Sequence, residues 1–392
     1  MAEEVLPGAL AGIRVVTTGQ ILAAPYCATL LREFGAEVIK VEQPGIGDPN
    51  RDNISFAQDN RGVQSVTIDL RIPEGKVLFR RLCDTADILI ENFRPGTLEG
   101  WGVAPDSLRE TNPGLIAVRI SGYGQTGPYK DRASFDRVAL AMSGLTYLTG
   151  YEDSPPVRPG YFVADYGAGT FAAFGALAAL QARAHTGKGQ DVDVALYEAV
   201  WRMSGTYAGG YGRTGTARER HGNYVPGVVP AEQFTTADGA YLVVNCTTAR
   251  AFARLCDAIG QPELLADPRF AARRDLQANY EAIHAILGAW VAARSLAECQ
   301  RVFDEAGVPA MQVYGIQEIL ADAHYAARDQ VVTVEDAAFG PLLQPGIVPR
   351  LTGTPGRVQG RAPSLGEHTD SVLAGLGLTP GEVAALRTAK AI

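Results

Sequence analysis

Residues 13–42 read IRVVTTGQILAAPYCATLLREFGAEVIKVE, and this stretch decides the fold. Ile13 to Thr18 is a run rich in β-branched residues, which is typical of a buried strand. Residues 26–35 have helical periodicity, and residues 36–42 (AEVIKVE) are expected to form a second strand. A strand, a helix and a second strand in this order predict a right-handed unit whose two strands are parallel.

The same alternation continues along the chain. Further strands are expected at residues 65–70, 87–91, 115–120 and 191–196, with helical segments between them. This pattern predicts an α/β fold with a large, doubly wound, parallel-sheet domain of the Rossmann-like kind. Ligands bind at the carboxyl edge of such sheets, so we expect residues 19–25, 92–96 and 121–128 to line a crevice. No GxGxxG follows the first strand, so a dinucleotide cofactor is not supported.

The second half of the chain predicts a smaller α/β domain. Residues 1–205 and 330–392 are assigned to the large domain and residues 226–329 to the small one, in which Asp238 and Gly239 form a hairpin turn. Residues 206–225 are rich in glycine and predict a linker or a mobile active-site loop. The closing strand and helices are expected to return to the large domain.

Composition excludes several classes of function. The chain has 392 residues and a formal net charge of -8, without a basic block, which argues against nucleic-acid binding. No apolar run approaches the ~18 residues of a membrane span, so no membrane partner is expected. The five cysteines are scattered, which disfavours disulfides and a zinc site and favours the cytoplasm. The histidines show no metal-binding spacing, and no tightly bound cofactor is expected.

One carboxylate stands out in residues 155–170, PPVRPGYFVADYGAGT. Asp165 is predicted at or just before the N-terminus of an Ala-rich, buried helix, where free N–H groups favour a negative charge. Asp is a common N-cap, so these residues alone favour a capping role. The alternative is a nucleophile that attacks an activated acyl group, with backbone N–H groups stabilising the oxyanion. No GxSxG motif offers a serine nucleophile instead.

The motifs together resemble the family III CoA-transferases, whose members include the carnitine/crotonobetaine and formate/oxalate enzymes. The resemblance extends from about Leu10 to the C-terminus and is carried by GAEVIKVE (35–42), ENFRPG (91–96), GQTGP (124–128) and Asp165. It reverses the preference for a capping role. In that family the matching Asp attacks an acyl-CoA thioester to give an acyl anhydride, becomes an aspartyl-CoA thioester, and passes CoA to a free carboxylic acid. The anhydride keeps the acyl group activated, so no ATP is needed.

The resemblance also implies a set of CoA contacts. Asn92 would hydrogen-bond CoA and Phe93 would pack against it. The full expected set is Gln20, Ile21, Leu22, Ala23, Leu70, Arg71, Asn92, Phe93, Arg94, Thr97 and Arg137. Gln43, Gly100 and Ser134 stand where the formate enzyme has basic residues, so Arg71, Arg94 or Arg137 would hold the CoA phosphates instead. Gln20 replaces a histidine of that enzyme, which implies a different acceptor acid.

Two alternative functions remain. The family includes α-methylacyl-CoA racemases, which carry a His-Asp pair at the segment matching Phe135-Asp136; Phe135 cannot act as the base, which disfavours racemisation. The chain could instead be a non-catalytic CoA-binding subunit. The resemblance implies an interlocked dimer, either a homodimer or a heterodimer with a paralogous subunit. It also implies that residues 222–227 cover the active site.

Overall fold

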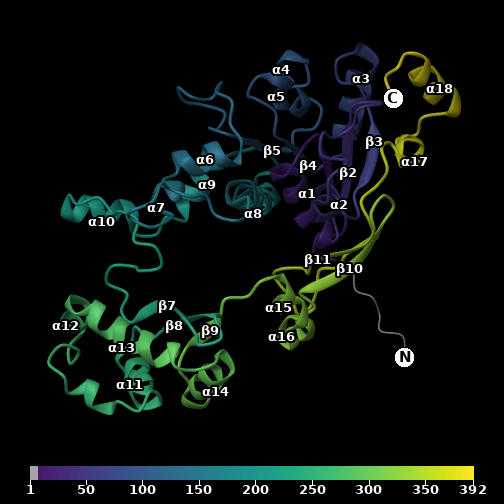
Figure 1. The fold of residues 1–392 in the computed structure, drawn as a ribbon. Helices are drawn as coiled ribbons and strands as arrows, with labels where there is room; N and C mark the ends of the chain where they lie inside the picture. The colour runs from purple at the N-terminus through teal and green to yellow at the C-terminus, as the bar shows by residue number, and fades with distance from the viewer. Residues whose placement is uncertain (1–7) are drawn as a thin grey trace. The chain divides into compact units, whose positions relative to one another are not determined.

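The computed structural model describes residues 8–392, which form two compact units (Figure 1). The first unit comprises the chain through Tyr147, Val157–Arg218 and Ala326–Ile392. The second comprises Leu148–Pro156 and Glu219–Tyr325. Each unit has its own hydrophobic core, so each is described separately.

The first unit is built on a six-stranded sheet in which all neighbouring strands are parallel. The strands are β1 (Arg14–Thr17), β2 (Glu37–Glu42), β3 (Gln64–Thr67), β4 (Ile88–Glu91), β5 (Ile116–Ser121) and β6 (Asp191–Ala195). Their order is β3-β2-β1-β4-β5-β6, the order of dinucleotide-binding folds. The parallel sheet expected from the sequence is therefore confirmed. The strand order reverses between β1 and β4, where a ligand crevice is expected.

Helices cover both faces of this sheet, as Figure 1 shows. Val15 and Val16 are adjacent in β1 and fully buried, yet they belong to different hydrophobic clusters, because successive strand residues point to opposite faces. The sheet is thus apolar on both sides. The helices of the first half are α1 (Ala23–Glu33), α2 (Ile54–Asp59), α3 (Pro73–Cys83), α4 (Thr97–Gly100), α5 (Pro105–Arg109), α6 (Asp136–Met142) and α7 (Leu145–Leu148), followed by α8 (Val163–Thr186), α9 (Leu196–Arg202) and α10 (Tyr207–Thr214).

Helix α8 lies against α1 through small residues. Alanines at positions 164, 168, 172 and 176 are fully buried on its inner face. At Gly169 the two helices are so close that a Cβ atom would lie 2.7 Å from the Ala23 carbonyl oxygen. The small residues of the Asp165 segment therefore serve the close approach of a neighbouring backbone.

The outer face of α8 differs from the expectation of a buried helix. Phe174 is 69% exposed and Leu177 is also exposed. By length and composition α8 could cross a membrane, which corrects the expectation that no segment has these properties. Its inner face belongs to the hydrophobic cluster of the sheet, and the core helix of a soluble domain passes the same test.

The C-terminal segment belongs to the first unit. It contains the antiparallel hairpin of β10 (Val331–Asp336) and β11 (Gly340–Pro345), then α17 (Thr369–Gly375) and α18 (Pro380–Thr388). The His368 N–H donates to the Ser65 carbonyl at 2.9 Å, and the Asp69 N–H donates to the Ala391 carbonyl at 2.8 Å. The last residues of the chain thus complete the β3 edge of the sheet.

The second unit is a smaller α/β structure around an antiparallel sheet of order β7-β8-β9. The hairpin expected at Asp238-Gly239 joins β7 to β8. Its elements are β7 (Ala231–Thr235), β8 (Tyr241–Asn245), α11 (Ala249–Ala258), η1 (Pro262–Leu265), α12 (Arg273–Ala278), α13 (Tyr280–Ala292), α14 (Leu296–Ala306), β9 (Ala310–Gln312) and α15 (Ile316–Ala321); α16 (Ala323–Ala327) follows.

The stretch expected as a glycine-rich linker is partly helical. Tyr207–Thr214 forms α10, although Gly209, Gly210 and Gly212 have low helix propensity. Gly215 ends the helix in the left-handed region with φ 68°, and its N–H donates to the Tyr211 carbonyl. Residues 207–214 are therefore helical within the stretch for which the sequence predicts a linker or a mobile loop, because glycine lowers helix propensity without forbidding a helix.

The contact at Gly169 predicts opposite effects for two glycines of α8. Gly169→Ala should lower the free energy of unfolding by about 1–3 kcal/mol, because the new methyl group would collide with backbone. Gly167→Ala should raise it by about 0.5–1 kcal/mol, since only the flexible end of Met203 is near and alanine favours the helix. Urea denaturation of both variants measures this. Equal effects at the two positions would contradict the packing described.

Candidate active site

A small cleft opens at the carboxyl edge of the sheet, at the reversal of strand order. It has a volume of about 120 Å³. Loops that follow β1, β4 and β5 meet there with the first turn of α8. The lining residues are Gln20, Ile21, Leu22, Ala23, Asn92, Phe93, Ile120, Ser121, Gly122, Ser134, Phe135, Asp165 and Leu196. The structure thus brings Asp165 together with residues from all three of the loops that were expected to line a crevice.

Asp165 lies inside the first turn of α8. The helix begins at Val163 and its N-cap position is Phe162, so the alternative that Asp165 is the N-cap is wrong. Another residue supplies the capping oxygen. Asp136 Oδ1 accepts the Ala164 N–H at 2.8 Å and the Asp165 N–H at 3.3 Å. The carboxylate of Asp165 is left to face the cleft.

The surroundings of Asp165 make it an unusually weak acid. Its pKa is raised from the ordinary 3.8 to about 7, chiefly by removal from water and, to a lesser extent, by the nearby carboxylates of Asp136 and Asp59. Both effects disfavour the charged form. A carboxylate in such a place is more basic than an exposed one once ionised, and strongly shifted acids are common in active sites.

The loop after β1 holds a strained residue. Ile21 has φ 69°, which is unusual for a β-branched side chain. Its N–H donates to both carboxylate oxygens of Asp48, at 3.2 Å each. Lys40 Nζ in turn donates to Asp48 Oδ2 and to the Gly19 carbonyl, both at 2.8 Å. This buried ion pair therefore fixes the loop that forms one wall of the cleft.

Asn92 joins that loop to the one after β4. The Gln20 N–H donates to Asn92 Oδ1 at 2.9 Å, and Asn92 Nδ2 donates to the Gln20 carbonyl at 2.8 Å. The Asn92 side chain, which is expected to bind CoA, thus makes two hydrogen bonds with the backbone of Gln20. Its contact with CoA stays a prediction, and the hydrogen bonds of the structure give it an orienting role.

The turn after β4 is held by a second buried ion pair. Glu91 Oε2 accepts the Phe93 N–H at 2.7 Å, and Glu91 Oε1 accepts a hydrogen bond from Arg119 Nε at 2.8 Å. Burial raises the pKa of Glu91 to about 7 in spite of the arginine. The Phe93 ring lies edge-on to Trp101, with 5.1 Å between centroids. Phe93 is therefore fixed from both its backbone and its side chain.

The other expected CoA contacts lie outside the cleft. Leu70 is buried in the hydrophobic cluster on the α3 side of the sheet. The exposed Arg71 guanidinium donates to Asp69 at 2.6 and 2.8 Å. Arg94 and Arg137 are exposed, and Thr97 begins α4. None of these five residues lines the cleft around Asp165.

Sequence reasoning missed the residues that hold the cleft in place. Lys40 and Asp48 were given no role, although both are fully buried. A signal was present, because a lysine inside a strand that is covered on both faces needs a buried partner. No such signal exists for the hydrogen bonds that Asp136 accepts from α8, since 28 residues separate Asp136 from Ala164.

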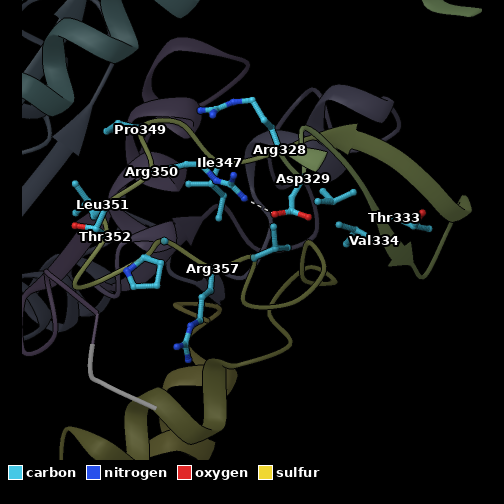
Figure 2. Close-up of a pocket in the computed structure, with 14 residues that line it drawn as sticks. Arg328, Asp329, Thr333, Val334, Ile347, Pro349, Arg350, Leu351, Thr352 and Arg357 are labelled. Atoms are coloured by element: carbon cyan, nitrogen blue, oxygen red, sulfur yellow. Dashed lines mark hydrogen bonds and ion pairs between the residues drawn. The ribbon is translucent and has the colours of Figure 1, made fainter. Parts of the chain in front are cut away.

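A larger cavity lies elsewhere in the first unit, along residues 328–358, with a volume of about 670 Å³ (Figure 2). Its arginines do not converge on one point. Arg350 pairs with Asp329, while Arg328 and Arg357 extend away from one another. The cavity has size without a gathered set of reactive groups, so the cleft at Asp165 is the better candidate for chemistry.

The buried ion pair behind the Ile21 loop predicts a large loss of stability on Lys40→Met. Asp48 would lose its buried cationic partner, and the free energy of unfolding should fall by about 3–5 kcal/mol. Arg301→Met, which breaks the exposed pair with Glu305, is the control and should cost at most about 1 kcal/mol. Urea denaturation measures both. Similar losses in the two variants would contradict the importance of the buried pair.

The raised pKa of Asp165 predicts a pH-dependent cost to folding. The folded chain binds this proton more tightly than the unfolded chain, so this group's contribution to stability falls as pH rises from 3.8 to about 7. Asp165→Asn removes that loss. The variant should gain stability relative to the wild type between about pH 4 and about pH 8, measured as the difference in unfolding free energy. A difference independent of pH would contradict the shift.

Comparison with known proteins identifies the chain's family. Residues 10–369 match the model of CoA-transferase family III. The chain is 42% identical to succinyl-CoA--D-citramalate CoA-transferase of Chloroflexus aurantiacus, over 100% of both chains. It is 40% identical to the beta subunit of succinyl-CoA--L-malate CoA-transferase of that organism, over 98% of each chain.

The fold gives the same answer. A solved structure of a CAIB/BAIF family protein from Brucella suis superimposes with a TM-score of 0.83 at 33% identity. The match covers 95% of this chain and 100% of that one. The resemblance proposed from the motifs is therefore confirmed: this chain belongs to the family III CoA-transferases and is an enzyme of that class.

Proposed function

We propose that Asp165 is the nucleophile that carries CoA from an acyl-CoA thioester to a free carboxylic acid. The observation that supports this most is its position: a basic carboxylate facing the cleft at the point where the strand order reverses. The thioester substrate follows from the family. The role of this side chain is the part that needs a test.

The reaction proceeds in four balanced steps. A carboxylate oxygen of Asp165 attacks the acyl carbon, and the C–S bond breaks to give a mixed anhydride and CoA thiolate. The thiolate attacks the aspartyl carbonyl, which releases the donor acid and leaves an aspartyl-CoA thioester. The acceptor carboxylate attacks that thioester, giving a new anhydride and thiolate. The thiolate then attacks the acceptor acyl carbon and restores Asp165, so no ATP is consumed.

The start of α1 offers groups that can stabilise the developing negative charge. Ala23 is the first residue of this helix and lines the cleft with Asp165. The first N–H groups of a helix have no acceptor within the helix, and its dipole favours an anion there. We assign these N–H groups to the oxyanion that forms on the attacked carbonyl. Arg94 and Arg137, both exposed, are kept as contacts for the CoA phosphates, together with Arg71.

We infer that the substrates are short dicarboxylic acids and their thioesters. The two relatives at 42% and 40% identity carry succinyl-CoA with D-citramalate or L-malate in their names. The cleft is small, which suits acids of this size. An assay with succinyl-CoA as donor and citramalate, malate, glutarate and oxalate as separate acceptors distinguishes the members of this class.

We also propose that the working enzyme contains two chains. Large apolar side chains are exposed on consecutive helices of the first unit, which is typical of an association surface. They include Phe135, Val138, Met142, Phe174, Leu177, Trp201, Met203 and Tyr211.

The five cysteines are all buried and unpaired, which supports a reducing compartment such as the cytoplasm.

A second candidate function is that of one subunit in a mixed assembly. It is favoured by the name of the 40% identical relative, which is a beta subunit. Light scattering followed by assay of the purified single chain separates a homodimer from a mixed assembly: turnover by a homodimer excludes the need for a paralogue.

Racemisation is disfavoured, because Phe135 lines the cleft where the racemases carry their histidine base.

The nucleophile is tested with Asp165→Ala. Turnover between succinyl-CoA and its acceptor should fall by at least about 10³-fold, because no covalent intermediate can form. Asp304→Ala, at an exposed aspartate of α14, is the control and should keep wild-type turnover. Mass spectrometry of the wild type quenched with hydroxylamine should show a hydroxamate at Asp165. Undiminished turnover in Asp165→Ala would refute the proposal.

A further inference from the structure

Asp136 is a buried carboxylate that the proposed reaction does not use. It is the first residue of α6 and is only 3% exposed. The preceding residue, Phe135, lines the cleft. One oxygen of Asp136 accepts two successive N–H groups of α8, those of Ala164 and Asp165. The contact thus joins the start of one helix to the start of another.

The second oxygen of Asp136 is unusual. Asp136 Oδ2 is buried and has no hydrogen-bond partner in the described part of the chain. A buried carboxylate oxygen without a donor is costly, and such groups call for an explanation. An N-cap alone would not need a full charge at this place, since Ser, Thr and Asn cap helices as well as Asp does.

The N-terminus of α8 makes this charge tolerable. Helix dipoles favour an anion at the first turn, and two N–H groups already point at Asp136. The same geometry brings the charge close to Asp165, whose own N–H is one of the two donors. The N–H groups at the start of α8 therefore stabilise the carboxylate of Asp136 and not that of Asp165.

We propose that Asp136 is a positioning residue that fixes the backbone of Asp165 and holds a negative charge beside its carboxylate. This rests on the proposed role of Asp165 as nucleophile. The first effect aims the carboxylate into the cleft. The negative charge of Asp136 destabilises the ionised form of Asp165. The Asp165 carboxylate is therefore more basic and more nucleophilic once it is ionised.

The charged groups around Asp165 are consistent with an electrostatic effect of Asp136 on its carboxylate. Among the described residues, the charged groups that shift its pKa are Asp136 from α6 and Asp59 at the end of α2, and both raise it. Asp59 is engaged elsewhere, because it accepts a hydrogen bond from Tyr166 at 3.1 Å. From α1, Tyr26 meets Tyr166 edge to face. Of these two carboxylates, Asp136 is the one that accepts the backbone N–H of Asp165.

Asp136→Asn separates the charge from the geometry. The amide oxygen of Asn can accept the same two N–H groups, whereas the charge is gone. The acid limb of the kcat/KM profile should move to lower pH by about one unit, the size of effect that a neighbouring charge has on a carboxyl group. On the alkaline plateau turnover should fall about threefold, taking a Brønsted slope near 0.5 as for thiolate nucleophiles. The unfolding midpoint in urea should change little.

Two further variants complete the experiment. Asp136→Ala removes charge and hydrogen bonds together, so turnover should fall at every pH by more than in Asp136→Asn. Asp336→Asn is the matched control, because Asp336 Oδ1 likewise accepts two backbone N–H groups, from Ala338 and Phe339, far along the chain in the β10–β11 turn. Its pH profile should coincide with that of the wild type.

The outcome that overturns the inference is a pH profile of Asp136→Asn that superimposes on the wild type. Asp136 would then be a structural cap. A readout independent of turnover is the pH dependence of unfolding: Asp165→Asn should alter it less in an Asp136→Asn background than in the wild type. A wrong assignment of the nucleophile would give a different result. Asp165→Ala would then keep wild-type turnover, while the pH dependence of unfolding would still show the coupling between Asp136 and Asp165.

Discussion

The contact between α1 and α8 is the constraint on which the site depends. Gly169 lets the two helices meet at backbone distance, where any side chain would force them apart. Both helices begin at the carboxyl edge of the sheet. Their close contact therefore places Asp165, in the first turn of one, in the same cleft as Ala23, at the start of the other. Packing thus brings together the proposed nucleophile and the helix terminus that we assign to the oxyanion.

The walls of the cleft are held by buried charges. Lys40 and Asp48 fix the loop after β1, and Glu91 with Arg119 fixes the turn after β4. Buried pairs of this kind add little to net stability, because desolvation offsets their attraction. What they provide is a defined backbone, including an isoleucine in the left-handed region that the loop would not otherwise adopt. Acids with raised pKa values at the same edge show that this region gives up stability for a specific arrangement of charge.

The family explains the reaction class, and the geometry adds an account of how one carboxylate can perform it. A CoA-transferase must keep an acyl group activated without ATP, so its nucleophile has to leave as readily as it attacks. A carboxylate that desolvation and like charges make basic attacks more readily than an exposed one, while its anhydride stays reactive. In the proposal made here, Asp136 contributes to this basicity. Its carboxylate caps α8 and supplies part of the like charge that raises the pKa of Asp165.

The sequence by itself determined the sheet and the reaction class. Apolar strands alternate with helical segments along residues 13–196, and the motifs at residues 35–42, 91–96 and 124–128, together with Asp165, are specific enough to indicate the family. The tertiary structure decided what the local pattern could not carry. The Asn92–Gln20 clasp, the Lys40–Asp48 pair and the cap from Asp136 to α8 join segments between 8 and 72 residues apart. Propensity and periodicity describe neighbours along the chain, whereas hydrogen bonds and burial of this kind arise only when distant segments meet.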